Sequence, residues 1–226
     1  MKKSFISMVV LFVVFGLMSF SFAEEKISAV EEYINKINLE NLEKYSVKIF
    51  STGQAGIGFC TGTVLSNEED KSTVLTCKHC LQADEEFLVE GNKVEKIITT
   101  TGEDLAYLIV EGKLKDKQAA SLGVYNESVG AVVRMYGQPG LATIHAEYGE
   151  VLMYTKNYGF AKLDVIGGCS GSGLFNDNDE LIGVVWGAFT EGGVGGGFFS
   201  EPTGGIKIGL FEPLDDVRKF LEQIKE

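Results

Sequence analysis

The segment around Ser170 contains the residue types that a serine nucleophile needs. It reads Gly167-Gly-Cys-Ser-Gly-Ser-Gly-Leu-Phe-Asn176, with glycines on both sides of the serine. Glycines permit a tight backbone turn that would expose the Ser170 hydroxyl. The same turn would let the backbone amides of Gly168 and Ser170 converge on a developing oxyanion. Because glycine-serine runs also mark ordinary turns, the segment predicts catalysis only in combination with a base elsewhere in the chain.

A serine nucleophile requires an adjacent base, and the chain has 2 histidines, His79 and His145. His79 lies near the end of the segment Ser72-Thr-Val-Leu-Thr-Cys-Lys-His-Cys80, which begins with a β-like run. His145 lies in Thr143-Ile-His-Ala-Glu147, which we interpret as a strand or loop without triad-like neighbours. We therefore expect His79 to be the base, the alternative being a structural histidine in a β turn.

The base in turn needs a carboxylate that holds its tautomer and orientation. Asp104, in Gly102-Glu-Asp-Leu-Ala-Tyr-Leu-Ile-Val110, is the expected partner of His79. Glu103 and Asp84 are the alternatives, and Asp104 itself has an ordinary explanation as an aspartate at the start of a strand. These residues predict acyl transfer through a serine, a histidine and an aspartate.

The order of these segments resembles that of the trypsin/chymotrypsin-like serine peptidases. A strand pair that includes Gly58-Phe-Cys-Thr-Gly-Thr-Val-Leu-Ser66 leads into Thr-x-x-His-Cys, then Asp-Leu-Ala-x-Leu, then Gly-x-Ser-Gly. The serine segment and its sequel, Leu181-Ile-Gly-Val-Val-Trp-Gly187, are most similar to the bacterial glutamyl-endopeptidase (V8-like) branch. The resemblance extends over residues 46–226, and it implies His79 as general base, Asp104 as its orienting acid and Ser170 as nucleophile.

The fold that this resemblance implies is mostly β, with two six-stranded antiparallel barrel lobes at about residues 46–115 and 125–211. The implied activity is that of a secreted serine endopeptidase, which hydrolyses peptide bonds through an acyl-enzyme and needs no cofactor or metal. A catalytically silent peptide-binding or adhesive protein on the same fold is the alternative. Two features favour this alternative weakly: Cys169 beside the serine and Val185 in the substrate strand.

The resemblance also suggests where a substrate would bind. Val185, Trp186 and Gly187 match the family segment that pairs with an extended substrate backbone. Val185 stands where the glutamyl endopeptidases carry a histidine, so a preference for glutamate is not implied. Asp164 lies six residues before Ser170, where trypsin-type enzymes place the acid that receives Lys or Arg. The alternative for Asp164 is an aspartate at a strand end that faces solvent.

The chain has 4 cysteines. The resemblance pairs Cys60 with Cys80, which leaves Cys77 and Cys169 on either side of the site. We expect these two to form a second disulfide, and two buried free thiols are the alternative. We expect no metal at Cys77-x-His79-Cys80, because a second ligand cluster is missing and export implies an oxidising compartment.

The elements that must position these residues are short β-rich runs separated by Gly, Asn or Asp clusters. We expect strands near residues 47–50, 58–65, 73–76, 96–100, 105–110, 129–136, 149–154, 159–163, 181–185 and 196–199. Apolar residues recur at three- and four-residue steps over residues 24–45, which predicts a helical segment. A removable pro-region is the role that we consider for this segment. An amphipathic helix over residues 212–226 closes the chain.

Residues 1–23 have the pattern of a secretory signal peptide. Lys2 and Lys3 precede an uncharged run over residues 8–18, and Ser21 and Ala23 supply the small residues of a cleavage site. The run is shorter than the ~20 residues that span a bilayer. We therefore expect cleavage after Ala23, a secreted or periplasmic product and no membrane anchor.

The composition narrows the classes of partner. The 226 residues suffice for one large domain or two lobes, and 45% of them are hydrophobic. The net charge of −12 argues against nucleic-acid binding, which requires a basic excess. We expect a monomer whose partner is a protein or peptide substrate.

Overall fold

The computed structural model describes residues 39–53, 56–81, 86–124, 126–141, 143–190, 193–195 and 207–225, with side chains in 190 and 193–195 left undescribed. All of them belong to one compact unit, Leu39–Glu226. The predicted signal peptide, most of the predicted segment 24–45 and the predicted strand 196–199 lie outside the described residues. Within those residues, none of the helices has the length and apolar character needed to cross a membrane.

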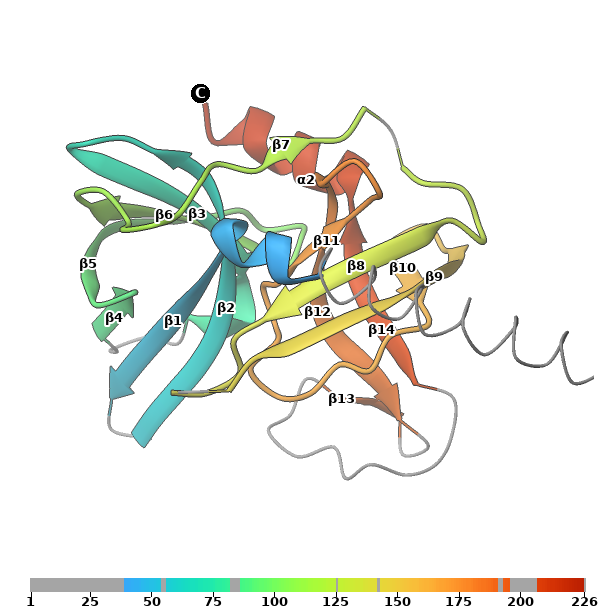
Figure 1. Cartoon of the computed structure of the whole chain (residues 1–226). Coiled ribbons are helices and arrows are strands. Elements are labelled where there is room, and N and C mark those ends of the chain that lie inside the picture. Colours follow the sequence, from blue (N-terminus) through green and yellow to red (C-terminus); the bar gives the residue numbers. More distant parts are fainter. Residues whose placement is uncertain are drawn as a thin grey trace, which may run out of the picture. The chain divides into compact units, whose positions relative to one another are not determined.

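The first lobe is a closed antiparallel barrel of six strands (Figure 1). Its strands are β1 (Ser46–Gly53), β2 (Gly56–Asn67), β3 (Lys71–Cys77), β4 (Glu86–Val89), β5 (Asn92–Thr99) and β6 (Leu105–Glu111). They follow the order β1-β2-β3-β6-β5-β4, and the pairing of β4 with β1 closes the barrel. Alternate side chains point inward, as in any strand, and residues such as Val47, Ile49, Val74 and Leu108 fill the interior.

The second lobe is built from strands in the C-terminal half of the chain. They are β8 (Val132–Gly137), β9 (His145–Tyr154), β10 (Gly159–Ala161), β11 (Gly173–Phe175), β12 (Glu180–Thr190), β13 (Gly193–Gly195) and β14 (Ile208–Pro213). All of these except β13 form a closed barrel in the order β11-β8-β9-β10-β14-β12. The barrel is closed because β11 pairs with both β8 and β12. β13 extends β12 at its far end, and the short β7 (Ser121–Leu122) pairs with β12 in parallel. The predicted mostly-β fold with two six-stranded antiparallel barrels is confirmed.

A shared hydrophobic cluster joins the two lobes. It combines Leu75 and Leu105 of the first barrel with Phe175 and Val184 of the second. Helix α2 (Leu214–Gln223) adds Val217 and Phe220, and Leu42 of the 3-10 helix η1 (Asn41–Tyr45) completes it. The site described below lies over this cluster, so its residues from the two lobes are held by common packing.

The observed boundaries differ from the predicted ones at the C-terminus. The helix begins at Leu214 rather than at residue 212, because Glu212 and Pro213 extend β14 and pair with Val184 and Gly183. Strands β4, β7, β11, β13 and β14 were not predicted. β11 and β13 have only three residues each and contain glycine, so they carry too little alternating pattern to be recognised.

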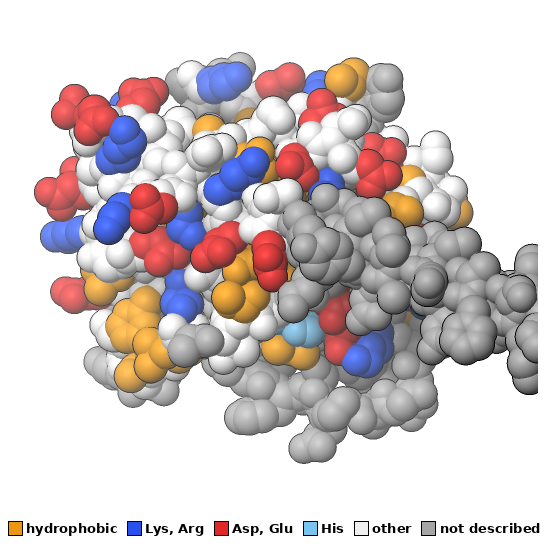
Figure 2. Space-filling view, in the orientation of Figure 1, with side chains coloured by type: hydrophobic (Ala, Val, Ile, Leu, Met, Phe, Trp, Pro, Cys, Tyr) orange, Lys and Arg blue, Asp and Glu red, His pale blue; other side chains and the backbone are white. Residues whose placement is uncertain are grey.

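The surface in Figure 2 mixes charges of both signs. Asp and Glu side chains are spread across this face, and Lys and Arg side chains lie among them. No broad basic patch dominates the described part of this face, in keeping with the net charge of −12.

Candidate active site

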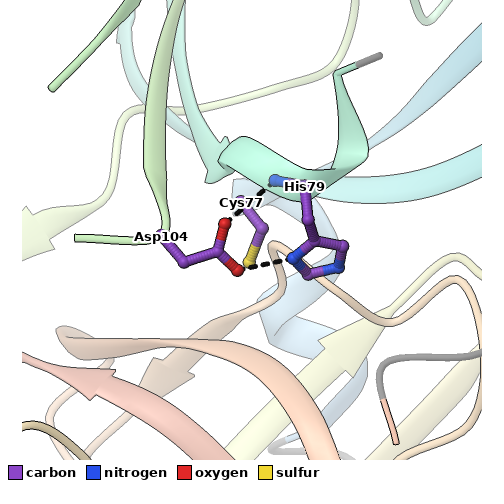
Figure 3. Close-up of side chains that lie close together, drawn as sticks. All are labelled: Cys77, His79 and Asp104. Atoms are coloured by element: carbon purple, nitrogen blue, oxygen red, sulfur yellow. Dashed lines mark hydrogen bonds and ion pairs between the residues drawn. The ribbon is translucent and has the colours of Figure 1, made fainter. Parts of the chain in front are cut away.

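His79 and Asp104 form a two-point hydrogen-bonded pair (Figure 3). Asp104 Oδ2 lies 2.5 Å from His79 Nδ1, and Asp104 Oδ1 accepts a hydrogen bond of 2.9 Å from the His79 backbone amide. The carboxylate thus selects the tautomer with a proton on Nδ1, which leaves Nε2 as the acceptor nitrogen. In Figure 3 the second ring nitrogen points away from Asp104, as a general base would require.

The pairing of β3 with β6 explains why these two residues meet. Cys77 at the end of β3 is opposite Leu105 at the start of β6. His79 follows in the 3-10 helix η2 (Lys78–Cys80), and Asp104 immediately precedes β6. Glu103 instead bonds Thr100, and Asp84 lies outside the described residues, so Asp104 is the described carboxylate that contacts His79.

Ser170 sits in a turn that is clamped against the first lobe. Its carbonyl oxygen accepts a hydrogen bond of 2.9 Å from the Thr61 amide, and Thr61 Oγ1 donates to the carbonyl of Gly168. Gly171 has a φ of +89°, and a Cβ added there would lie 2.0 Å from the Thr61 carbonyl oxygen. Only glycine fits this position, because both the backbone conformation and the space exclude a side chain.

The turn leaves two backbone amides available. Among the described residues, the amides of Gly168 and Ser170 donate to no protein group, whereas those of Cys169, Gly171 and Ser172 all do. Gly168 has a φ of +91° and packs closely on Pro139, so the peptide of this glycine is held in a conformation that other residues rarely adopt. Two amides without a protein acceptor are what an oxyanion hole requires, so Gly168 and Ser170 remain the candidates for this role.

The Ser170 hydroxyl points toward the backbone of β12 in the second lobe rather than toward His79. Its Oγ donates a hydrogen bond of 3.2 Å to the carbonyl oxygen of Trp186, and among the described residues it has no bond to His79. The residue is 8% exposed, and a change of χ1 rotamer would turn Oγ away from the Trp186 carbonyl. Hydrogen bonds between catalytic groups are often long or misaligned before substrate binds, so this geometry is compatible with a resting nucleophile.

The predicted substrate strand lies beside Ser170. Val185, Trp186 and Gly187 are part of β12, and a register shift between Val185 and Gly187 bends the strand where it passes Ser170. The Trp186 ring packs on Tyr158 with 5.1 Å between ring centroids, and its buried Nε1 has no partner among the described residues. Trp186 thus combines a packing role with a position next to the serine.

A buried carboxylate that the sequence analysis missed also reaches this centre. Glu212 Oε1, on β14, accepts a hydrogen bond of 3.2 Å from the backbone amide of Asp104. Burial and the neighbouring carboxylates raise the pKa of Glu212 to about 7. Nothing in the local sequence indicates such a role, since Glu212 stands between a strand and a helix and its contact lies 108 residues away.

The cysteines agree with only one of the two predicted disulfides. Cys60 and Cys80 are bonded and link β2 to the His79 segment. The prediction of a second disulfide is wrong, because Cys77 and Cys169 are buried free thiols. They belong to different hydrophobic clusters, and Cys77 donates to the Val185 carbonyl, so neither sulfur is directed at the other. Burial raises the pKa of the Cys169 thiol to about 12 and that of Cys77 well above its usual range.

Asp164 lies in a separate cluster of charged residues. Its carboxylate pairs with Lys207, and its backbone oxygen lies 2.6 Å from Nε2 of His145. Glu147 is 3.9 Å from the same histidine nitrogen, and burial raises the pKa of Glu147. His145, at the start of β9, thus has Asp164 and Glu147 as partners rather than Asp104, and the charge of Asp164 is balanced by Lys207.

Within the part of the chain that the structure describes, two groups of side chains have donor atoms close enough to hold a metal ion: Cys77, His79 and Asp104, and His145, Glu147 and Asp164. In the first group the two Asp104 oxygens accept hydrogen bonds from His79, and the Cys77 thiol donates to the Val185 carbonyl. In the second group the Lys207 ammonium occupies the Asp164 carboxylate. A metal ion in either group would therefore have to replace hydrogen bonds or an ion pair that the structure already contains.

A protein-family model for the trypsin-like peptidase domain matches residues 60–184, which include His79, Asp104 and Ser170. The chain belongs to the trypsin-like peptidase family. The matched segment begins within β2 and ends within β12. Family membership supports a serine protease. Among curated proteins, by contrast, no sequence matches this chain.

Solved structures of serine proteases share the fold of this trypsin-like peptidase. The active form of the Rv3671c protease from M. tuberculosis is 19% identical and covers 82% of each chain, with a TM-score of 0.62. Mouse neuropsin is 16% identical over 81% of this chain and 95% of its own, with a TM-score of 0.60. The inactivated protease paralogue S-I1 of the scabies mite is 15% identical over 80% and 93%, again with a TM-score of 0.60. At such identities the likeness concerns the fold alone.

Proposed function

We propose that this chain is a secreted serine endopeptidase in which His79, Asp104 and Ser170 form the catalytic triad. The observation that carries the proposal is the His79–Asp104 pair, whose geometry leaves Nε2 of the ring as the free base. The turn at Ser170 supplies the other half of the site, the nucleophile and two backbone amides, those of Gly168 and Ser170, that donate to no described group.

In the proposed reaction, His79 Nε2 takes the proton of Ser170 while Oγ attacks the carbonyl carbon of the scissile peptide bond. The amides of Gly168 and Ser170 stabilise the oxygen that becomes negative in the tetrahedral intermediate. The imidazolium then gives its proton to the leaving amine, and an acyl-enzyme remains. Water, deprotonated by His79, hydrolyses the acyl-enzyme and restores Ser170.

The extended strand β12 would bind the substrate backbone through Val185, Trp186 and Gly187. The motifs favour the V8-like branch, but Val185 lacks the charge that would select glutamate. The ion pair between Asp164 and Lys207 would oppose a simple trypsin-like preference, since a basic substrate side chain would have to displace the lysine. The export signal predicted in residues 1–23 is part of the proposal and would be tested by the N-terminal sequence of the secreted protein.

A catalytically silent peptide-binding protein is the second candidate. One observation favours it: the Ser170 hydroxyl is bonded to Trp186 rather than to His79. In this reading, β12 would still bind an extended peptide, but the serine would never attack it.

Labelling by a fluorophosphonate probe separates the two candidates. We expect the purified oxidised protein to be labelled and Ser170→Ala to be unlabelled. Ser172→Ala is the matched control, because Ser172 is a nearby serine that is fully buried, and this variant should still be labelled. A wild-type protein that stays unlabelled, also after removal of residues 24–38, which leaves the compact unit Leu39–Glu226 intact, would overturn the peptidase in favour of the binding protein.

A further inference from the structure

Glu212 contacts the catalytic pair from the second lobe. It lies opposite Val184 on β12, and its carboxyl group reaches across to the backbone amide of Asp104 in the first lobe. The residue is 3% exposed, although a glutamate is rarely buried unless it is paired. Among the described residues, no basic side chain forms an ion pair with Glu212. A buried carboxyl that contacts the orienting acid of a triad therefore needs an explanation.

The groups that face Glu212 are acidic or neutral. Asp104 and Glu103 approach it from the segment before β6, and Asp216 approaches from α2. The Cys77 thiol of β3 is also within electrostatic range of Glu212. Lys219 of α2 is paired with Asp216. Burial is the largest cause of the raised pKa of Glu212, and these carboxylates add to it, so the side chain exchanges its proton near neutral pH.

We propose that Glu212 is a positioning residue for the His79–Asp104 pair, which holds the Asp104 backbone through its carboxyl oxygen and sets the charge beside the pair through its proton. This inference rests on the proposed peptidase function. Protonated Glu212 keeps its hydrogen bond to the Asp104 amide and adds no charge. Ionised Glu212 places a second negative charge near Asp104, and this charge favours the imidazolium form of His79 over the free base.

Two substitutions separate the two parts of this role. Glu212→Gln keeps an oxygen acceptor for the Asp104 amide but cannot ionise, whereas Glu212→Leu removes both. For Glu212→Gln we expect the acid limb of the labelling rate with a fluorophosphonate to move to lower pH, with little loss at the plateau. For Glu212→Leu we expect the plateau rate to fall by about 10- to 100-fold, because the acid that orients His79 loses its support.

The control is Glu103→Gln, which removes a neighbouring negative charge that does not bond the Asp104 amide. If this variant moves the acid limb as far as Glu212→Gln does, general surface charge explains the effect and the proposal is overturned. The proposal also fails if the pH profiles of Glu212→Gln and wild type coincide. Glu212→Gln decides the question even if Glu212→Leu does not fold.

Two spectroscopic measurements keep this test independent of activity. Infrared difference spectra of the wild type should contain one buried carboxyl band that titrates near pH 7 and is absent from Glu212→Gln. NMR of the two histidine rings near pH 7 should show a change in the His79 signals, and not in those of His145, between wild type and Glu212→Gln. If these signals behave as expected while wild type is not labelled, the peptidase function fails and the coupling stands. If labelling succeeds and the signals do not change, the coupling fails and the peptidase stands.

Discussion

Ser170 donates its hydroxyl hydrogen bond to the carbonyl oxygen of Trp186, 3.2 Å away, and this contact links the proposed nucleophile to the strand that would bind the substrate. The next residue strengthens the link, since the Gly171 amide donates to Val185 at 2.7 Å. The serine turn is thus bonded to β12 on one side and to Thr61 of the first lobe on the other. A substitution that breaks either contact should therefore change the position of Ser170.

Asp104→Asn should lower the rate of fluorophosphonate labelling by about 10³- to 10⁴-fold, as loss of the orienting carboxylate does in such triads. The amide keeps the shape of the side chain but can no longer accept from both His79 donors and enforce the Nδ1–H tautomer. The measurement is the second-order labelling rate at neutral pH. Glu103→Gln should retain nearly the wild-type rate, and a loss of similar size in that variant would contradict the assignment of Asp104.

Gly171→Ala should destabilise the protein and abolish labelling. A φ of +89° costs a residue with a side chain about 1–3 kcal/mol, and the new Cβ would in addition clash with the Thr61 carbonyl. Urea denaturation measures the loss of stability, and probe labelling measures the loss of the site. Gly102→Ala is the control, since a Cβ there meets no atom within 4 Å. Equal stability of the two variants would show that the serine turn is not built as described.

Thiol titration should find no fast-reacting cysteine in the native protein and two after denaturation without reductant. Cys77 and Cys169 are buried, and burial raises the pKa of both thiols, so the reactive thiolate is scarce. The Cys60–Cys80 bond should persist until reductant is added. A denatured, unreduced protein without any free thiol would restore the second disulfide that the structure contradicts.

Stability should decrease as the pH rises from about 4.5 to about 7. In the folded protein the pKa of Glu212 is raised to about 7, so the native state keeps a proton that the unfolded state has already lost. Each pKa unit corresponds to about 1.4 kcal/mol, which makes the loss up to about 3 kcal/mol over this window. Urea denaturation at several pH values measures it.

Glu212→Gln should remove most of this slope and make the protein more stable than wild type above pH 7. A smaller slope of the same sign should remain, because burial also raises the pKa of Glu147. A slope that is equally steep in the variant would show that Glu212 does not carry the effect.

The sequence by itself determined the general architecture and the residues of the candidate site. Alternating apolar residues between Gly- and Asn-rich turns predict strands, because a strand buries every second side chain wherever it occurs. His79, Asp104 and Ser170 were recognised from short local motifs, and the structure brings the first two into direct contact. Short strands such as β11 escaped prediction because three residues contain too little periodicity.

Only the tertiary structure decided the contacts between distant parts of the chain. Cys77 and Cys169 flank the site in the sequence, yet they point into different clusters and remain thiols. The partner of Asp164 is Lys207, 43 residues later, and the partner of the Asp104 amide is Glu212, 108 residues later. Such pairings depend on how the barrels close and pack. Local patterns specify which groups a segment offers, but only the packed lobes determine which of them meet.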